Sequence, residues 1–366
     1  MKEPIETSYQ YSIRAPWLYS DVVRRQQGHW MDRLGFGPEP TPSRVVHCHT
    51  GVQLLAYQQP NAQQPVLLIV PAPIKTPYIW DLAPESSVVQ RCLGAGVQVY
   101  LMEWQRPQPG DEQMGLAEYA DSLIAQCLRA IARETGQSKV FLAGHSLGGT
   151  FAAIFASLHT ARLHGLIELE GPILFGPEVG KLESTVVKSP PGRALGDAFG
   201  NVPGSFLNIA SSWADFATFN QEPWIDRLRT WSSPRARRAH WRVRRWTLDE
   251  MPLPQRLFEE IVDGLYRGNR FACGTLQVDG RVADPHAITT PILAVSDPRS
   301  RVVPAKSVEA YHYLTESRDV QILQYQGDVG VMLQHVGVLV GENAHKSLWP
   351  LVLAWMHQHF SPEPAA

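Results

Sequence analysis

Ser146 lies in a sequence pattern typical of a catalytic serine. Apolar residues 140–143 predict a strand, residues 150–158 predict a helix, and Gly-His-Ser-Leu-Gly at 144–148 joins them. A serine on such a sharp turn projects its hydroxyl above the sheet edge, and a Cβ in place of either glycine would collide with neighbouring backbone. The start of the helix favours an oxyanion at this point. A chance match in a turn is the alternative, but the flanking elements favour an acyl-transfer nucleophile.

A serine hydroxyl needs an adjacent base, and an acid must orient that base. His335, after the last predicted strand, is the preferred base, and His345 is the second candidate. The alternative for His335 is a buried histidine with a purely structural role. Asp297, at the end of a late predicted strand, is the expected acid, although it could simply cap the next turn. Asp328 is the reserve acid.

Two backbone N–H groups should stabilise the oxyanion. One is that of Leu147, directly after the nucleophile. The other should come from the loop after the predicted strand at 66–70, where two prolines have no N–H to donate. Ala72 and Ile74 remain, and Ile74 is favoured. His145, beside the nucleophile, is expected to contact the substrate.

The order of predicted elements indicates an α/β fold. The short run at 65–70 is apolar throughout and predicts a strand buried on both faces of a mostly parallel sheet, and the predicted strands alternate with helical segments. An alternating stretch predicts an additional early hairpin strand. The strands are expected at 45–57, 65–70, 97–103, 140–143, 165–170, 291–296 and 320–324, and the helices at 87–93, 116–134, 150–158 and 348–360.

This alternation stops at about residue 185 and resumes after about residue 285. The intervening segment is rich in Trp, Pro, Gly and Arg and has helical patches without buried-strand runs, which predicts an inserted cap. The expected division is therefore an N-terminal extension (1–44), a first core part (45–184), the cap (185–285) and a second core part (286–366).

Composition sets broad limits. The 366 residues carry a formal net charge of −2, so there is no overall attraction to nucleic acid or an anionic membrane. The first 19 residues do not resemble a signal peptide, and no run is long enough for a transmembrane segment. Cys48, Cys92, Cys127 and Cys273 are widely separated, which suits reduced thiols in the cytoplasm. The His-Cys-His run at 47–49 is interpreted as strand residues, and no metal or cofactor is expected.

Several longer motifs resemble the catalytic subunit of class III polyhydroxyalkanoate synthases. The resemblance extends from about residue 45 to 360 and implies an α/β-hydrolase core with a mobile cap. It also implies activity on hydroxyacyl-CoA thioesters and growing polyester chains, and it suggests a homodimer or a partner subunit. The motifs are at residues 70–82, 84–89, 99–104, 200–208, 265–270 and 274–282.

The chain departs from this family at two positions. The family's cysteine nucleophile is replaced by Ser146, and the family's acid position, read without gaps, falls on Ser300. His335, before Val-Gly-Val at 336–338, matches the family. Asp297 stands three residues before Ser300 and would need a different loop to reach His335.

The serine changes the expected chemistry. A cysteine passes through a thioester, which keeps the acyl group activated, whereas Ser146 would form an oxygen ester close in energy to the polymer bond. Transfer to water then becomes more competitive, which favours an esterase, thioesterase or depolymerase. A polymerising acyltransferase is the alternative. A third hypothesis is an inactive partner protein at polyester granules, suggested by the missing acid at Ser300.

An arginine-rich stretch lies inside the expected cap. It could hold the phosphates of a CoA substrate or dock an acidic partner. The alternative is a solvated helix face whose tryptophans pack inward. The residues are Arg235, Arg237, Arg238, Arg242, Arg244 and Arg245, with Trp231, Trp241 and Trp246.

Overall fold

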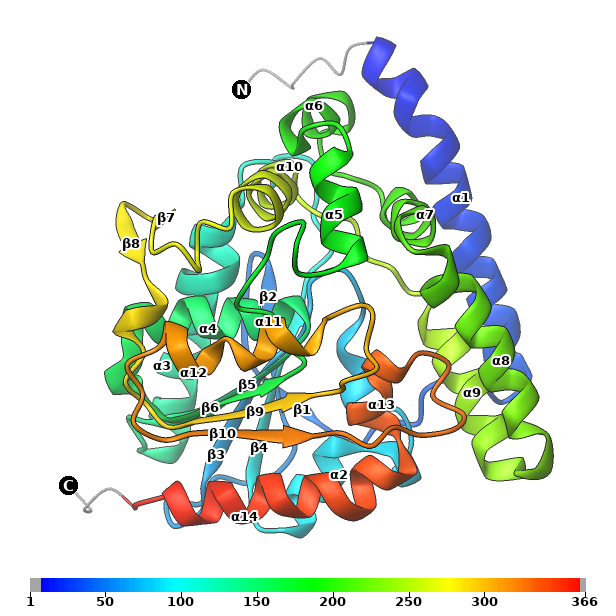
Figure 1. Cartoon of the computed structure of the whole chain (residues 1–366). Helices are drawn as coiled ribbons and strands as arrows, with labels where there is room; N and C mark the ends of the chain where they lie inside the picture. The colour runs from blue at the N-terminus through cyan, green and yellow to red at the C-terminus, as the bar shows by residue number, and fades with distance from the viewer. Residues whose placement is uncertain (1–7, 363–366) are drawn as a thin grey trace.

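A computed structural model describes residues 8–362 of the chain. Its central element is an eight-stranded sheet with the order β1-β2-β4-β3-β5-β6-β9-β10 (Figure 1). β2 pairs antiparallel with both β1 and β4, and every other pairing in the sheet is parallel. The strands are β1 (Arg44–His49), β2 (Val52–Ala56), β3 (Val66–Val70), β4 (Gln98–Trp104), β5 (Val140–His145), β6 (Leu163–Leu169), β9 (Ile292–Ser296) and β10 (Val320–Gln324).

Helices cover both faces of this sheet, so the expected α/β architecture is confirmed. One apolar core joins the sheet to α3 (Leu123–Thr135), α4 (Leu147–His159) and the short α11 (Ala305–Glu309) and α12 (Tyr311–Leu314). The core of the other face includes α2 (Val88–Gly94), α13 (Gln334–Val340) and α14 (Trp349–His359). Every residue of β3, β5 and β9 is buried, because parallel strands between two helical layers contact apolar side chains on both sides.

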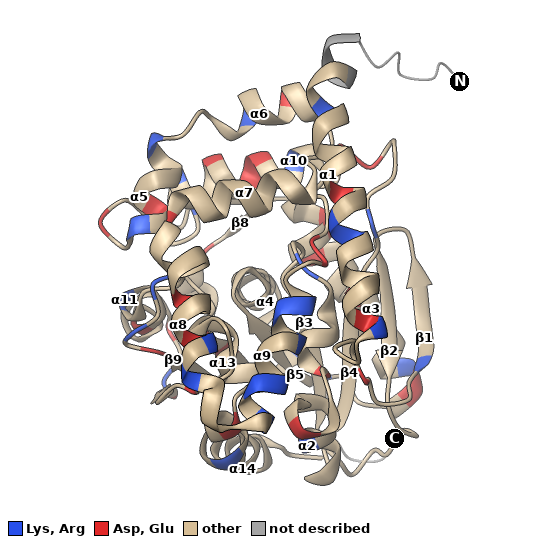
Figure 2. Ribbon diagram, turned by 90° about the vertical axis from the view of Figure 1, so that its right-hand side faces the viewer, with Lys and Arg blue, Asp and Glu red and all other residues tan. Residues whose placement is uncertain are grey.

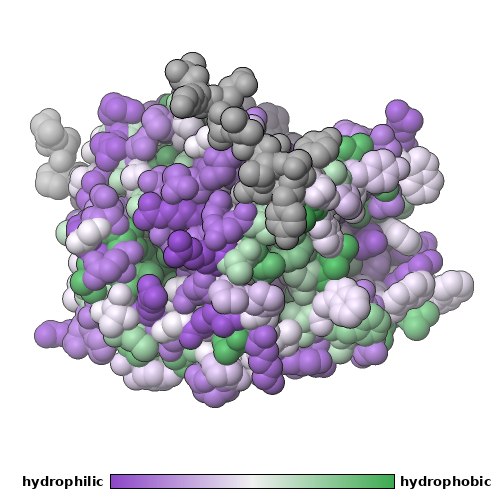
Figure 3. Space-filling model, turned by 90° about the horizontal axis from the view of Figure 1, so that it is seen from above, coloured by the Kyte–Doolittle hydropathy of each residue, from purple (hydrophilic) through white to green (hydrophobic). Residues whose placement is uncertain are grey.

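Between β6 and β9 the chain leaves the sheet and forms the mainly helical segment predicted as a cap. Within the described residues of this segment, the regular element that is not helical is a small antiparallel hairpin. The elements are α5 (Lys181–Lys188), α6 (Gly192–Phe199), α7 (Gly204–Ala214), α8 (Glu222–Arg229), α9 (Pro234–Trp246), α10 (Gln255–Glu259), β7 (Leu276–Val278) and β8 (Arg281–Ala283). Seen from above, the surface on this side carries hydrophilic and hydrophobic patches side by side (Figure 3).

The N-terminal extension contains a long helix, α1 (Ser8–Arg33), which continues through Pro16. It packs along α7 and reaches α9 (Figure 1). Sequence analysis did not predict this helix. Among the described residues, no helix is both long enough and apolar enough to cross a membrane. Residues 1–7, which belong to the segment compared with a signal peptide, lie outside the described residues.

Candidate active site

Ser146 sits at the turn between β5 and α4 in a strained backbone conformation. Its φ is 55° and its ψ is −132°, a combination that is unfavourable for a residue with a Cβ. The main-chain oxygen of Ser146 accepts hydrogen bonds from the N–H groups of Gly149 and Thr150, which start the helix. A Cβ on Gly148 would lie 2.2 Å from the oxygen of Val70, so glycine permits close packing of the turn against β3.

His335 lies in the first turn of α13, and its partner is Glu170. The Nδ1 atom of the imidazole is 2.7 Å from Oε2 of Glu170, which follows β6 directly and has a φ of 46°. Glu170 is fully buried and His335 is almost so. His335 and Ser146 line the same cavity. Ser146, Glu170 and His335 keep the chain order Ser, acid, His expected for this constellation.

The expected pairing of Asp297 with His335 is wrong. The Asp297 carboxylate accepts hydrogen bonds from the backbone N–H of Arg299 and from its guanidinium, at 2.8 to 3.1 Å. These bonds hold the carboxylate in its own loop, while Glu170 occupies the position beside the imidazole. An acidic residue directly after a buried strand downstream of the nucleophile was the sequence signal for Glu170, and sequence analysis did not use it.

The two reserve candidates have other partners. Asp328 accepts hydrogen bonds from the Tyr325 hydroxyl at 2.7 Å and from the Asn343 N–H at 2.9 Å. The Nε2 atom of His345 lies 2.9 Å from the Leu339 oxygen. Both side chains therefore stabilise the segment around α13.

Ser300, which the resemblance places where an acid is expected, supports Glu170 instead. Its hydroxyl donates a 2.8 Å hydrogen bond to Oε2, the same oxygen that faces His335. Burial raises the pKa of Glu170 well above its usual value, and the Ser300 hydrogen bond opposes this shift. Burial also lowers the pKa of His335 to about 3. The imidazole is therefore neutral near pH 7, as a general base must be.

Replacing Ser300 with alanine is expected to move the acid limb of the pH–rate profile to higher pH. The hydroxyl favours the charged carboxylate, so its loss raises the pKa of Glu170 further, and activity is lost at a higher pH as Glu170 protonates. A hydrogen bond of about 1 kcal/mol corresponds to a shift of roughly half to one pH unit. The measurement is kcat/KM against pH for ester hydrolysis. Ser157→Ala removes a buried hydroxyl bonded to Ile154 and should leave the acid limb in place; equal shifts in both variants would contradict the prediction.

His145, predicted as a substrate contact, lies against the base. Its Nε2 atom is 2.8 Å from the His335 main-chain oxygen, and the two rings are 4.4 Å apart between centroids. Burial is the main cause that lowers the pKa of His145. The His145 side chain thus fixes the backbone that carries the His335 imidazole. It also lines the cavity, and substrate contact remains a proposal.

The cavity has a volume of about 670 Å³ and lies between the core and the cap. Core residues at the nucleophile form one side, and apolar side chains of the cap form the other. Leu147, Ala72 and Ile74, the three candidates for the oxyanion hole, all line it. A Cβ on Gly148 would be 2.8 Å from the Ala72 nitrogen, so the loop after β3 passes directly over the start of α4. The cap side includes Leu182, Val186, Leu195, Phe206, Leu207, Phe258, Ile261, Val262 and Tyr266.

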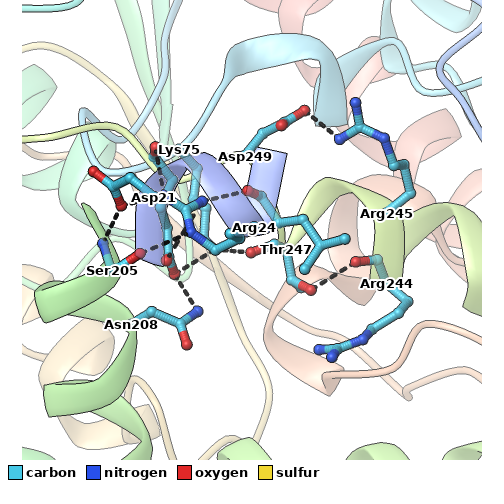
Figure 4. A network of polar contacts seen from close by, with 11 residues as sticks. Asp21, Arg24, Lys75, Ser205, Asn208, Arg244, Arg245, Thr247 and Asp249 are labelled. Atoms are coloured by element: carbon cyan, nitrogen blue, oxygen red, sulfur yellow. Dashed lines mark hydrogen bonds and ion pairs between the residues drawn. The ribbon is translucent and has the colours of Figure 1, made fainter. Parts of the chain in front are cut away.

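A buried polar network holds the cap against this loop. Lys75, next to Ile74, donates hydrogen bonds to Glu250 at 2.6 Å and to the Thr247 oxygen at 2.8 Å. Asn208 of α7 donates to the same Glu250 oxygen as Lys75. Arg24 of α1 contacts Asp21, Ser205 and the main-chain oxygens of residues 248 and 250. Helix α1, the cap and the loop after β3 therefore meet at one point (Figure 4).

Three of the six arginines in the predicted cluster are already paired with carboxylates. Arg242 binds Glu39, Arg245 binds Asp32 and Asp249, and Arg235 lies 3.6 Å from Glu342. Basic positions gather visibly on α8 and α9 (Figure 2). Among residues 8–362, no group of three or more His, Cys, Asp or Glu side chains is arranged to hold a metal ion.

The family of this chain follows from its sequence. The model of the alpha/beta hydrolase fold family matches residues 65–326. The chain therefore belongs to the α/β-hydrolase fold family and to its class of enzymes, as the serine motif predicted.

Within this family the chain is similar to poly(3-hydroxyalkanoate) polymerase subunits PhaC. It is 28% identical to the subunit of Haloferax mediterranei over 86% of this chain, but it spans only 63% of that relative's length. It is 26% identical to the subunit of Allochromatium vinosum, with 87% of this chain and 89% of that protein covered. The expected resemblance to polyhydroxyalkanoate synthases is confirmed.

Solved structures confirm the fold. The Paleococcus ferrophilus monoacylglycerol lipase superposes with a TM-score of 0.54 at 15% identity, covering 84% of this chain and 99% of the lipase. A soluble variant of monoglyceride lipase from Saccharomyces cerevisiae gives a TM-score of 0.54 at 14% identity, with 89% and 96% covered. At these identities the similarity shows a shared architecture only.

Proposed function

We propose that this enzyme uses Ser146 to transfer acyl groups from hydroxyacyl esters or thioesters to water, with His335 as base and Glu170 as acid. The observation that carries this proposal is the imidazole of His335, which is bound by Glu170 and lines one cavity together with the strained Ser146. Asp297, the acid expected from sequence, has no role in this proposal.

The reaction follows from the roles of these groups. Nε2 of His335 accepts the Ser146 proton as Oγ bonds to the acyl carbon, and the Glu170 carboxylate holds Nδ1–H and stabilises the imidazolium. The Leu147 N–H and one from the loop after β3, with Ile74 favoured, would stabilise the oxyanion. The leaving alkoxide or thiolate takes the proton from His335. Water then attacks the acyl-serine and gives a proton to the histidine. The imidazolium returns this proton to Oγ as the bond between Oγ and the acyl carbon breaks, and the free acid leaves.

The substrate class is supported by the similarity to poly(3-hydroxyalkanoate) polymerases and by the apolar side chains that line the cap side of the cavity. Such side chains suit the hydrocarbon parts of a hydroxyalkanoate chain. Serine in place of the family's cysteine favours hydrolysis, because the acyl-serine is an oxygen ester and is less activated for transfer to another hydroxyl.

A polymerising acyltransferase is the second candidate. It is supported by the relatives named polymerase subunits, which match 86% and 87% of this chain. Hydroxyacyl-CoA would then release CoA and form polyester. The idea of an inactive partner protein loses its main argument, because Glu170 supplies an acid where Ser300 cannot.

Two assays test the proposal. The purified protein should hydrolyse a short p-nitrophenyl ester and react with a fluorophosphonate probe, since both reactions require an activated serine. With 3-hydroxybutyryl-CoA, free acid and CoA in equal amounts would support the hydrolase, whereas insoluble polyester would support the polymerase. A correctly folded protein that neither labels nor hydrolyses would overturn both.

The remaining expectations concern location and assembly. The resemblance to the synthases supports a cytoplasmic enzyme that associates with polyester granules and forms a homodimer. Exposed Trp213, Trp224 and Trp231 give the cap an apolar surface that would suit self-association. Sedimentation velocity of the full chain tests the dimer, and a monomer at all concentrations would refute it.

A further inference from the structure

One arginine of the cap differs from its neighbours in what surrounds it. Arg244 lines the cavity that contains Ser146 and His335, whereas the other five arginines of the predicted cluster do not. No carboxylate of the described residues lies within ion-pair distance of the Arg244 guanidinium, in contrast to Arg242 and Arg245 on the same helix. In Figure 4 no dashed line meets its guanidinium, and its main-chain oxygen accepts a hydrogen bond from the Thr247 hydroxyl.

The side chains that line the cavity carry more positive than negative charge. Lys75 and Arg244 are the basic residues among the described residues that line it, and Glu250 is the acidic one. Glu250 is already bound by Lys75 at 2.6 Å and by Asn208. Arg244 is exposed and forms no ion pair with Glu250, so its guanidinium remains open to an anionic ligand. Desolvation lowers the pKa of Arg244, and the charge of Glu250 opposes this shift.

We propose that Arg244 forms an anion-binding subsite in the active-site cavity, which holds a carboxylate or phosphate that the substrate carries away from its reacting acyl group. A guanidinium group presents paired N–H donors that match either anion. The apolar cap side chains would contact the hydrocarbon part of the substrate, and Arg244 would fix its charged end. This inference rests on the proposed function, since the substrate class comes from it.

Two sources can supply this anion. A hydroxyalkanoate oligomer ends in a free carboxylate, and an acyl-CoA carries phosphates. Each has a neutral counterpart: the methyl ester of the oligomer, and the acyl-pantetheine that lacks the phosphates. Comparing each anion with its counterpart shows whether charge is recognised and which source provides it.

Binding to Ser146→Ala protein tests the subsite without turnover. Calorimetric titration would use a linear trimer of 3-hydroxybutyrate and its methyl ester, and butyryl-CoA and butyryl-pantetheine. At least one anionic ligand should bind more tightly than its counterpart, and Arg244→Gln should reduce this preference about 10- to 100-fold, the range of charge-assisted hydrogen bonds. Arg238→Gln is the matched control, because Arg238 is exposed on the same helix but does not line the cavity; it should keep the preference.

The possible results separate the two proposals. Equal binding of every anion and its counterpart, or the same preference with and without Arg244, would overturn the subsite. A preference that depends on Arg244 in a protein that hydrolyses none of these ligands when Ser146 is intact would leave the subsite standing and remove the proposed function. In the active enzyme, Arg244→Gln should change the ratio of KM values between an anionic substrate and its neutral counterpart. The factor should equal the one found for the dissociation constants.

Discussion

Replacing Ser146 with alanine is expected to reduce kcat/KM for a short p-nitrophenyl ester by about 10⁵- to 10⁶-fold, the scale seen when a serine nucleophile is removed. The acyl-enzyme then cannot form, because alanine has no Oγ atom to carry the acyl group. The imidazole can only assist a direct attack by water. Fluorophosphonate labelling should disappear together with the activity. The measurement is initial-rate hydrolysis alongside labelling of the same preparation.

The matched control is His345→Gln, since His345 bonds only to its own segment and was the alternative base. The thermal unfolding temperature of this variant shows any structural cost of changing a buried side chain. Its kcat/KM should stay within a factor of about ten of wild type, because His345 does not line the cavity. Residual activity above a tenth of the wild-type value in Ser146→Ala would mean that another residue is the nucleophile.

The variant Ser146→Cys adds a second readout. Its acyl-enzyme would be a thioester, which should raise the share of polyester over free acid formed from 3-hydroxybutyryl-CoA.

The fold was largely predictable because its signals are local. Runs such as 66–70 and 292–295 are apolar throughout, which suits a parallel strand between two helical layers. The turn at Ser146 was predictable for the same reason, since its two glycines allow contacts that a Cβ would block. Helix α1 was missed because its mean hydropathy is low and Pro16 lies inside it, so its stability depends on contacts with the cap.

The acid was not predictable from the same kind of signal. Asp297 and Glu170 both follow buried strands, and sequence alone does not show which carboxylate points to the imidazole. Arg299, two residues after Asp297, binds the Asp297 carboxylate. This local pairing keeps Asp297 in its own loop and away from His335. The serine at position 300, where the resemblance leads us to expect an acid, donates a hydrogen bond to the carboxylate that contacts His335.

Replacing Glu170 with glutamine should therefore lower kcat by about 10³- to 10⁴-fold, as expected when the acid partner of a catalytic histidine becomes an amide and the wrong tautomer is favoured. Glutamine has nearly the same shape, so the buried site should remain folded. Asp297→Asn, which alters the carboxylate bound to Arg299, should cost less than about tenfold by comparison. The assay is single-turnover and steady-state ester hydrolysis, with unfolding temperatures for both variants. The opposite ranking would restore Asp297 as the acid and remove Glu170 from the mechanism.

A double variant tests the same assignment by gain of activity. The Ser300 hydroxyl lies 2.8 Å from the Glu170 oxygen that faces His335, so a carboxylate introduced at position 300 would lie close to the imidazole. Ser300→Asp in the Glu170→Gln background should recover about 10- to 100-fold of the lost rate, because one ionised acid again orients Nδ1–H. In the wild-type background the same change should reduce activity, since two carboxylates would share one buried site and one of them would be protonated. A gain of activity in the Glu170→Gln background and a loss in the wild-type background is the pattern expected if an acid after β6 and an acid after the neighbouring β9 can orient the same imidazole.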